Sequence, residues 1–302
     1  MDEAGEDGRT AAGGEAPEIS VIVPHYNDTA RLGLCLERLI AQSVPAPDYE
    51  IIVVDNGTPG GLGPLVARFP QVRFLVEPQK GAAHARNAGV AAARAPRLAF
   101  IDCDCIPEPD WLAAGLAGLA QADLVGGSVT VTCSDPVRPS PVERFERIFA
   151  FDQARYVQEK HFSVTANLLT HRVVFDAVGP FRDGYPEDVD WCHRARAKGY
   201  RLAYVEAARV SHPARRSWAE LESKWRRTSR EAFRAARDQP GWRWRWPARA
   251  LLVLVSPFAH AGRVLGSSEA GGPLARIATL LVLFRLRLFR VRFMLALMGK
   301  RP

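Results

Sequence analysis

The chain has 302 residues, 47% of them hydrophobic and 24% charged, which is enough to bury the core of one large domain or two small ones. Its 24 glycines and 22 prolines follow no repeat, so collagen-like and low-complexity sequence classes are excluded. The net charge of +7 is unevenly divided, because residues 215–302 carry 19 Lys and Arg against five Asp and Glu, and this predicts that the end of the chain meets anionic partners.

The first 17 residues have no apolar periodicity and no apolar segment of the kind that secretory signals contain. We therefore expect residues 1–17 to form a disordered leader and the protein to be cytoplasmic. The five cysteines lack zinc-binding spacing and are expected to be reduced. Order is predicted to begin with a β-rich run at 19–24, and Asp28 then provides a capping signal for a helix with apolar residues through Ile40.

Three further apolar runs, 51–54, 72–76 and 98–101, predict strands, and an Ala-rich stretch at 84–95 predicts a helix. Near-continuous apolar strands that alternate with helices are typical of buried parallel strands in an α/β sheet. The first third of the chain is therefore predicted to be an α/β sheet flanked by helices.

Polar residues follow three of the four predicted strands, at 24–27, 55–56 and 102–104. In open α/β sheets, ligands bind at the carboxyl ends of the strands. We therefore expect these polar groups to converge on one edge of the sheet.

The pattern changes after residue 141. It predicts a helix over 142–157, an acidic cluster at 187–190, and a last strand at 201–210 that leads into His212. We interpret residues 18–214 as one domain, whose second half closes over the edge of the sheet.

Residues 215–302 contain five tryptophans among many arginines, followed by two uncharged stretches at 250–259 and 277–284. A spanning helix needs about 20 apolar residues, so neither stretch predicts a standard transmembrane helix. Two interpretations remain open for this basic, Trp-rich helical tail. It lies in the interface of an anionic membrane, on the inner face of the cytoplasmic membrane, or it packs as a helical subdomain on the body or on a second copy.

Asp102 and Asp104 are two carboxylates separated by one residue at a predicted strand end. In a tight turn both can point the same way and hold Mg²⁺ or Mn²⁺, which prefer oxygen ligands. Most such triplets are solvated turn residues, but the position after an apolar strand favours a metal site. Cys103 and Cys105 beside the pair are interpreted as packing residues.

Lys80, Gly81, Arg86 and Asn87 lie between the third strand and the Ala-rich helix. Glycine allows close backbone approach, a helix N-terminus favours an anion, and Lys and Arg add positive charge. This pattern indicates a diphosphate or sugar site, with an ordinary charged loop as the alternative. Asp55 accepts a hydrogen bond from a base or ribose, or it caps the turn that follows it.

Glu187, Asp188 and Asp190 place three acids within four positions. Like charges this close disfavour full ionisation, so one pKa is expected to rise toward the value that a general base needs. An acidic first helical turn that complements the helix dipole is the alternative, and both readings can hold together. His212 is either a metal ligand or a turn histidine whose hydrogen bonds are satisfied. Considered without the other motifs, it is interpreted as a turn histidine.

Five motifs now stand in order: 21–27 (VIVPHYN), 53–57 (VVDNG), Lys80-Gly81 with Arg86-Asn87, 102–104 (DCD) and 187–190 (EDVD). Together they resemble the signatures of the family-2 glycosyltransferases over about two thirds of the chain, residues 17–213. The resemblance implies the GT-A fold, a Rossmann-like mixed sheet flanked by helices, here with a C-terminal helical extension. It also implies a nucleotide-diphosphate-sugar donor, a divalent metal (Mg²⁺ or Mn²⁺), and inversion at the anomeric carbon.

The resemblance also implies residue roles, by matching position. The donor-binding residues are implied to be Pro24, Tyr26 and Asp55 at the nucleoside, Lys80, Arg86 and Asn87 at the diphosphate and donor sugar, and Asp102 at the ribose. The implied metal ligands are Asp102, Asp104 and His212. Asp188 matches the base and Glu187 helps to place the acceptor, while Asn167 falls on the acceptor side. Cys103 departs mildly from the family pattern, and residues after 215 match no motif.

The sequence leaves two competing functions. A nucleotidyltransferase usually has a Gly-rich basic loop after its first strand, and Pro24–Asp28 here has neither feature. A non-catalytic scaffold would dock on a membrane or a nucleic acid through its tail, but the apolar stretches have no role in nucleic-acid binding. We therefore expect a transferase of cell-envelope, exopolysaccharide or lipid-linked glycan synthesis, with a glycan or lipid-linked acceptor and no nucleic-acid partner.

Overall fold

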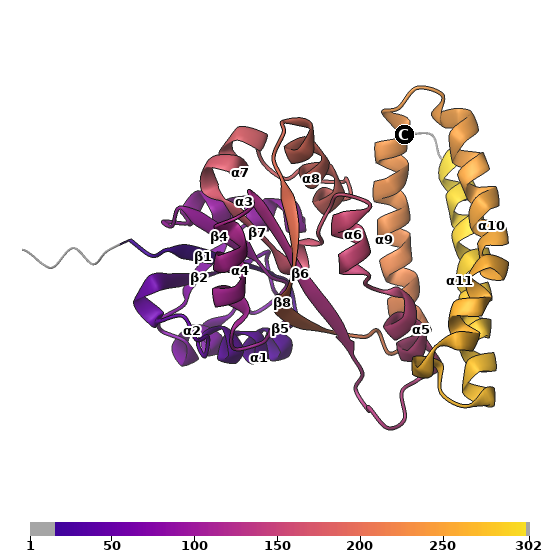
Figure 1. Ribbon diagram of the computed structural model, residues 1–302, viewed down its shortest axis with the longest axis horizontal. Coiled ribbons are helices and arrows are strands. Elements are labelled where there is room, and N and C mark those ends of the chain that lie inside the picture. The colour runs from indigo at the N-terminus through magenta and orange to yellow at the C-terminus, as the bar shows by residue number, and fades with distance from the viewer. Residues whose placement is uncertain (1–15, 300–302) are drawn as a thin grey trace, which may run out of the picture.

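The computed structural model describes residues 16–299, so the predicted leader lies outside the described residues except for its last two positions. A mixed sheet with helices on its faces forms the body of the molecule (Figure 1). Three long helices, α9 (Trp218–Arg237), α10 (Trp242–Gly266) and α11 (Pro273–Gly299), stand next to this body and contact one another. They form the C-terminal helical extension expected from the sequence.

Eight strands make one sheet in the order β3-β2-β1-β4-β7-β6-β8-β5. They are β1 (Ile19–His25), β2 (Tyr49–Asp55), β3 (Arg73–Val76), β4 (Arg97–Phe100), β5 (Ile106–Pro107), β6 (Leu124–Thr132), β7 (Leu168–His171) and β8 (Leu202–Pro213). Strands β1 to β4 run parallel, whereas β7 is antiparallel to β4 and β6, and β5 is antiparallel to β8. The sheet is therefore the mixed α/β sheet that the resemblance implies.

The helices of the body occupy the connections between these strands. They are α1 (Thr29–Leu39), α2 (Gly63–Arg68), α3 (Ala82–Ala92), α4 (Trp111–Leu119), α5 (Pro141–Phe149), α6 (Gln153–Gln158), α7 (Arg172–Val178) and α8 (Glu187–Ala197), with 3₁₀ turns at Ala46–Asp48 and Thr165–Asn167. A further 3₁₀ turn, Ser268–Ala270, lies between α10 and α11. Asp28 caps α1 as predicted, because its Oδ1 accepts a hydrogen bond from the amide of Arg31 at 3.3 Å. All seven residues of β1 and of β2 are buried, which explains their near-continuous apolar sequence.

Two predicted boundaries were wrong. The helix expected over 142–157 is two helices, because the chain breaks between α5 and α6 at residues 150–152. The last strand continues through His212 to Pro213, because β6 pairs alongside it as far as Thr132. His212 is thus a residue of β8, not of the turn after it.

Strand β6 was not predicted, since two adjacent glycines interrupt its apolar pattern. Close packing of β6 against β8 explains why glycine is needed here. A Cβ on Gly127 would lie 2.1 Å from the carbonyl oxygen of Ala208 in β8, at the point where the β6–β8 register shifts. Strand β7 has four residues, too few to show a periodicity.

The C-terminal helices have a core of their own, which joins them to the body through α5. Phe145 of α5, Leu221 of α9, Val264 of α10 and Leu286 of α11 belong to one buried apolar cluster. Further along, Trp246 packs against α11, and its Nε1 donates a hydrogen bond to a carbonyl of that helix at 2.9 Å. The three helices are therefore a packed unit on one side of the sheet.

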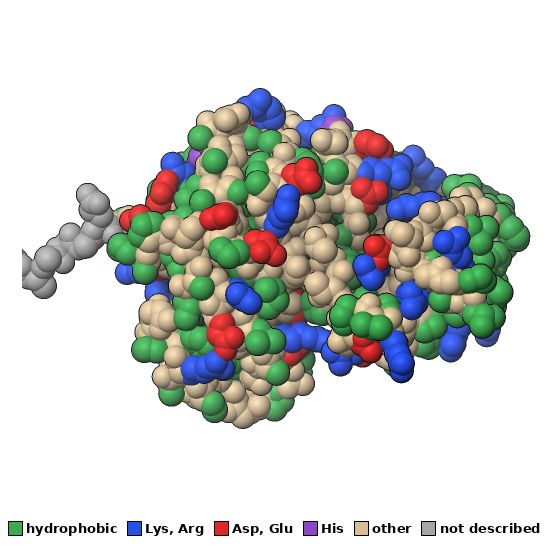
Figure 2. All heavy atoms as spheres, turned by 60° about the horizontal axis from the view of Figure 1, so that its bottom comes forward, with side chains coloured by type: hydrophobic (Ala, Val, Ile, Leu, Met, Phe, Trp, Pro, Cys, Tyr) green, Lys and Arg blue, Asp and Glu red, His purple; other side chains and the backbone are tan. Residues whose placement is uncertain are grey.

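The outer side of this unit exposes large apolar side chains, and hydrophobic side chains gather at that end of the molecule in Figure 2. Leu252 and Phe258 of α10 are 67% and 75% exposed, and Leu274 of α11 is 83% exposed. Within residues 16–299, α10 is the one helix that is long and apolar enough to cross a membrane by length and composition. One such helix is weak evidence for a membrane span, because core helices of soluble proteins meet the same criteria. The sequence predicted no spanning helix here because the uncharged stretch 250–259 has only ten residues. The helix that contains this stretch has 25 residues.

Candidate active site

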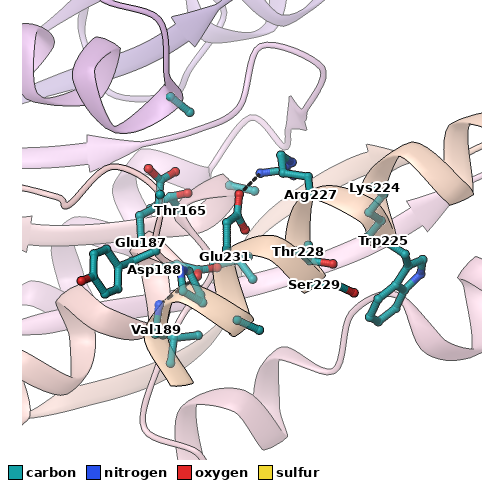
Figure 3. A pocket seen from close by; sticks show the side chains of 18 of the residues that line it. Thr165, Glu187, Asp188, Val189, Lys224, Trp225, Arg227, Thr228, Ser229 and Glu231 are labelled. Carbon is teal, nitrogen blue, oxygen red and sulfur yellow. Dashed lines mark hydrogen bonds and ion pairs between the residues drawn. The ribbon is translucent and has the colours of Figure 1, made fainter. Parts of the chain in front are cut away.

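The carboxyl ends of the central strands face α9 across a cavity of about 1410 Å³. Its walls come from β1, from the segment after β4, from the start of α8, and from the C-terminal helices; Figure 3 shows α9 opposite Glu187 and Asp188. The residues predicted for the site that line this cavity are Pro24, Tyr26, Arg86, Asp102, Asp104, Glu187, Asp188 and His212. The expected convergence at one sheet edge is therefore observed, and α9 supplies the opposite wall.

Asp104 and His212 form the part of the cavity best suited to a metal. His212 Nδ1 lies 2.8 Å from the carbonyl oxygen of Pro213, and since a carbonyl can only accept, Nδ1 carries the proton. In the neutral ring Nε2 is then an acceptor, and it faces Asp104 Oδ2 at 3.6 Å; the protonated ring pairs with that carboxylate instead. Two acceptors that face each other fit a cation between them, and the oxygen and imidazole donors suit Mg²⁺ or Mn²⁺.

The electrostatics of this pair agree with a cation site. Burial raises the pKa of Asp104, and the nearby charge of Asp102 adds to the rise against the opposing effect of His212. A divalent cation would relieve that crowding. Cys105 also lies within reach, but burial raises the pKa of its thiol and its side chain packs in the core. The interpretation of Cys105 as a packing residue agrees with this placement.

Arg86 joins two acidic elements of the site. Its guanidinium forms ion pairs with Asp102, at 2.5 Å, and with Glu187. The side chain of Arg86 is 4% exposed, and the coulombic attraction of Glu187 and Asp102 raises its pKa despite the opposing effect of burial. Within the described residues Arg86 therefore neutralises carboxylates, whereas the resemblance places it at the donor diphosphate.

Asp188 lies in the first turn of α8, and its pKa is raised to about 6. The expectation that one acid of this cluster has a raised pKa is confirmed, but burial is the larger cause and the charge of Glu187 the smaller one. Asp190 turns away and pairs with Arg194 at 2.8 Å. The acids thus open a helix and also supply a carboxyl group with a shifted pKa, so both readings of the cluster hold.

Asp55 is not among the cavity-lining residues. Its Oδ1 lies 3.1 Å from His25 Nδ1 and accepts a hydrogen bond of 2.5 Å from the hydroxyl of Thr58. Burial alone would raise the pKa of Asp55, but these hydrogen bonds lower it. The carboxylate holds the turn after β2, and its contact with a nucleoside stays a prediction.

Lys80 and Asn87 also lie beside the cavity and do not line it. Lys80 Nζ donates to the carbonyl oxygen of Asn56 at 2.7 Å and sits 4.3 Å from the ring centre of Tyr26. The amide of Asn87 exchanges two hydrogen bonds with the backbone of Phe181, at 2.9 and 3.0 Å. Both side chains hold the cavity walls in place, and their contact with the donor stays a prediction.

The expectation for Asn167 was wrong. Its side chain is fully buried, accepts from Trp111 Nε1 at 2.9 Å, and donates to the carbonyl oxygens of Ser128 and Ala208. It joins three elements of the core and does not line the cavity. The neighbouring Thr165 lines the cavity instead.

Sequence reasoning missed Glu231 of α9, which faces Glu187 and Asp188 in Figure 3. It pairs with Arg227 at 3.4 Å, and burial raises its pKa, with smaller contributions from Glu187 and Asp188. The available signal was compositional, since Glu231 is one of five acids in the basic tail.

Comparisons with known proteins give the family. The model of the glycosyl transferase family 2 matches residues 20–182, more than half of the chain. The chain is 32% identical over 219 residues to the glycosyltransferase AglE of Haloferax volcanii, covering 70% of this chain and 71% of that protein. It is 27% identical over 289 residues to the pre-mycofactocin glycosyltransferase of Mycobacterium tuberculosis, covering 91% of this chain and 57% of that protein.

Among solved structures, the mannosyltransferase PcManGT from Pyrobaculum calidifontis superposes with a TM-score of 0.60 at 20% identity, covering 93% of this chain and 86% of that one. This likeness confirms the fold, and its coverage extends beyond the sheet into the C-terminal helices. The motifs, the mixed sheet and the matched family model agree with one another. The chain belongs to glycosyl transferase family 2.

Proposed function

We propose that this glycosyltransferase is metal-dependent and inverting, and moves a sugar from a nucleotide-diphosphate donor to an acceptor hydroxyl. One observation carries the proposal: the Asp104–His212 pair and the carboxyl group of Asp188, with its pKa of about 6, line the same cavity. A transferase of this kind needs a cation for the leaving diphosphate and a base for the acceptor, and both have candidates here.

Asp104, His212 and Asp102 would hold Mg²⁺ or Mn²⁺. When bound, the cation stabilises the negative charge that develops on the diphosphate leaving group. Asp102 must exchange its ion pair with Arg86 for the metal, and Glu187 can retain that arginine. Because Arg86 pairs with both carboxylates, it can stay bound to Glu187 when Asp102 turns to the metal.

Asp188 is proposed to accept the proton of the acceptor hydroxyl. A carboxyl group with a pKa of about 6 is ionised at neutral pH and is a stronger base than an ordinary aspartate. The hydroxyl oxygen then attacks the anomeric carbon from the face opposite the diphosphate. The new bond forms as the old one breaks, so a single displacement inverts the configuration.

The acceptor is proposed to be a lipid-linked or cell-envelope glycan met at the inner face of the cytoplasmic membrane. The exposed apolar face of α10 and α11 supports this location, because Arg243 lies exposed on α10 beside it. Apolar side chains beside arginines complement a bilayer with anionic head groups. The alternative to membrane binding is that a second copy of the chain covers this apolar face.

The decisive experiment is a screen of nucleotide sugars for thermal stabilisation of the full chain, with and without Mn²⁺. GDP-mannose goes first, because the PcManGT structure is a complex with GDP-Man and Mn²⁺. We expect one donor to raise the melting temperature only with the metal, and transfer to release a nucleoside diphosphate and a product of inverted anomeric configuration. Release of pyrophosphate would support a nucleotidyltransferase, and the absence of any donor effect would contradict the proposal.

A further inference from the structure

The cavity has a second, basic region where α9 meets α10 and α11. Six arginines line the cavity as a whole. Three of them are paired with acids: Arg86, Arg215 and Arg227. The others are Arg245, Arg249 and Arg290, whose guanidinium groups form no ion pair and no side-chain hydrogen bond with any residue from 16 to 299. The basic region therefore carries positive charge that the described protein does not neutralise.

Arg290 is the most enclosed of the three. Its guanidinium stacks on the indole ring of Trp225, 3.9 Å from the ring centre, and its Nε is buried without an acceptor. Burial, together with the smaller effects of the charges of Arg287 and Arg249, lowers the pKa of Arg290 to about 9. It is still a cation at neutral pH, held where a cation is costly unless an anion joins it.

Two neutral donors line the same cavity, and one of them belongs to the tryptophan that Arg290 stacks on. The indole Nε1 of Trp225 and the hydroxyl of Thr228, both on α9, are buried and have no partner among residues 16–299. Of the six buried side-chain polar atoms in that condition, four belong to residues that line this cavity, so the deficit of acceptors is concentrated here. Cations and N–H or O–H donors without acceptors are what an anionic group requires.

We propose that Arg245, Arg249 and Arg290 bind the phosphate or diphosphate group of a phosphorylated acceptor. The planar guanidinium fork matches the oxygens of a phosphate. This inference rests on the proposed function, since it names the acceptor class for the same cavity. The donor diphosphate belongs to the Asp102–Asp104 region on the opposite wall, so the two phosphate sites are distinct.

The spacing along α9 agrees with such an acceptor. Thr228 and Trp225 precede Glu231 by three and six residues, which is about 4.5 and 9 Å along the helix axis. Glu231 faces Asp188 across the cavity (Figure 3). A phosphate beside Trp225 thus lies about 9 Å along the helix axis from Glu231, the residue that faces the proposed base. The apolar outer face of α10 and α11 is formed by the same helices, which favours a phosphate that carries a lipid.

The test is calorimetric titration of the full chain with n-octyl phosphate in metal-free buffer, where the Asp104 region cannot hold phosphate through a metal. We expect binding by the unaltered protein, and about tenfold weaker binding for Arg249→Gln and for Arg290→Gln. Arg292→Gln is the matched control, because Arg292 is exposed on α11 and does not line the cavity. It should change the affinity by less than about twofold.

Three further ligands identify the source of the phosphate. Octanol should not bind. A preference for octyl phosphate over glucose 1-phosphate and inorganic phosphate supports a lipid-linked acceptor, whereas equal binding of glucose 1-phosphate supports a soluble sugar phosphate. Affinities unchanged in both cavity variants, or reduced equally in Arg292→Gln, would overturn the subsite.

The exposed position of Arg249 keeps the test valid if Arg290→Gln fails to fold. Donor stabilisation with Mn²⁺ is measured on the same variants. If the unaltered protein binds the donor but not octyl phosphate, this inference alone is defeated. If the unaltered protein binds no donor, the proposed function is defeated.

Discussion

The guanidinium of Arg86 is paired with the carboxylate of Glu187, a residue 101 positions further along the chain. Because Arg86 lies on α3, Asp102 follows β4 and Glu187 opens α8, one side chain connects the first and second halves of the body at the wall of the cavity. This connection positions the proposed base, since Asp188 is the next residue of the same helical turn.

Arg86→Leu leaves two neighbouring carboxylates without their cation. We expect the free energy of unfolding to fall by about 3 kcal/mol, measured by urea denaturation at neutral pH. Arg155→Leu is the control, since its pair with Glu159 is exposed and should contribute almost nothing. Equal losses in the two variants would contradict a special role for the buried pair.

Asp188→Asn should abolish sugar transfer and leave Mn²⁺-dependent donor binding within about twofold, because the amide cannot accept the proton. The same variant should melt at a higher temperature than the unaltered protein at pH 8. The folded-state pKa is raised, so the ionised carboxylate is disfavoured in the folded protein above pH 6, and the amide removes that penalty. Retained turnover would assign the base to another residue.

The pH dependence of kcat/KM should show an acidic limb with a pKa of about 6. Asp188 must be ionised to act, so activity rises tenfold per pH unit below pH 6 and levels off above pH 7. Glu231→Gln is the control, because the pKa of Glu231 is also raised. The limb should persist in that variant, and a profile that is flat from pH 5 to 8 would exclude the assignment.

Asp104→Asn and His212→Gln should each weaken Mn²⁺-dependent donor binding by about tenfold or more, as seen in the thermal shift at graded metal concentrations. Asp110→Asn serves as the control, because Asp110 is exposed and outside the cavity. An unchanged metal requirement in both site variants would place the cation elsewhere.

The double variant Leu252→Glu and Phe258→Glu should lose flotation with vesicles that contain phosphatidylglycerol, because both side chains are exposed on the apolar face of α10. Val76→Glu, at a 73% exposed residue of the sheet body, is the matched control and should float normally. If the unaltered protein does not float but is a dimer that the double variant dissociates, the face is a contact between copies.

Local pattern was sufficient for the first half of the body. Strands β1, β2 and β4 were predicted because each is buried on both faces and reads as a short apolar run. The motifs after those strands had to converge, since parallel strands bring their carboxyl ends to one edge. The family resemblance and most of the acidic site follow from these two properties.

Other features depended on partners far along the chain. Asn167 and Asn87 have polar side chains that a sequence pattern cannot distinguish from ligand-binding ones, yet burial and backbone hydrogen bonds occupy them. The misplaced end of the last strand and the missed strands have the same origin, because pairing with a neighbouring strand decides where a strand lies and where it ends.

The sequence by itself determined the family, the order of the sheet-edge motifs and the basic character of the tail, because these depend on residue type and spacing alone. Only the tertiary structure decided that burial raises the pKa of Asp188, that Glu231 faces it, and that three arginines of the same cavity have no ion-pair partner among residues 16–299. Burial and the distance between charges are properties of packed elements, and no local stretch of sequence contains them.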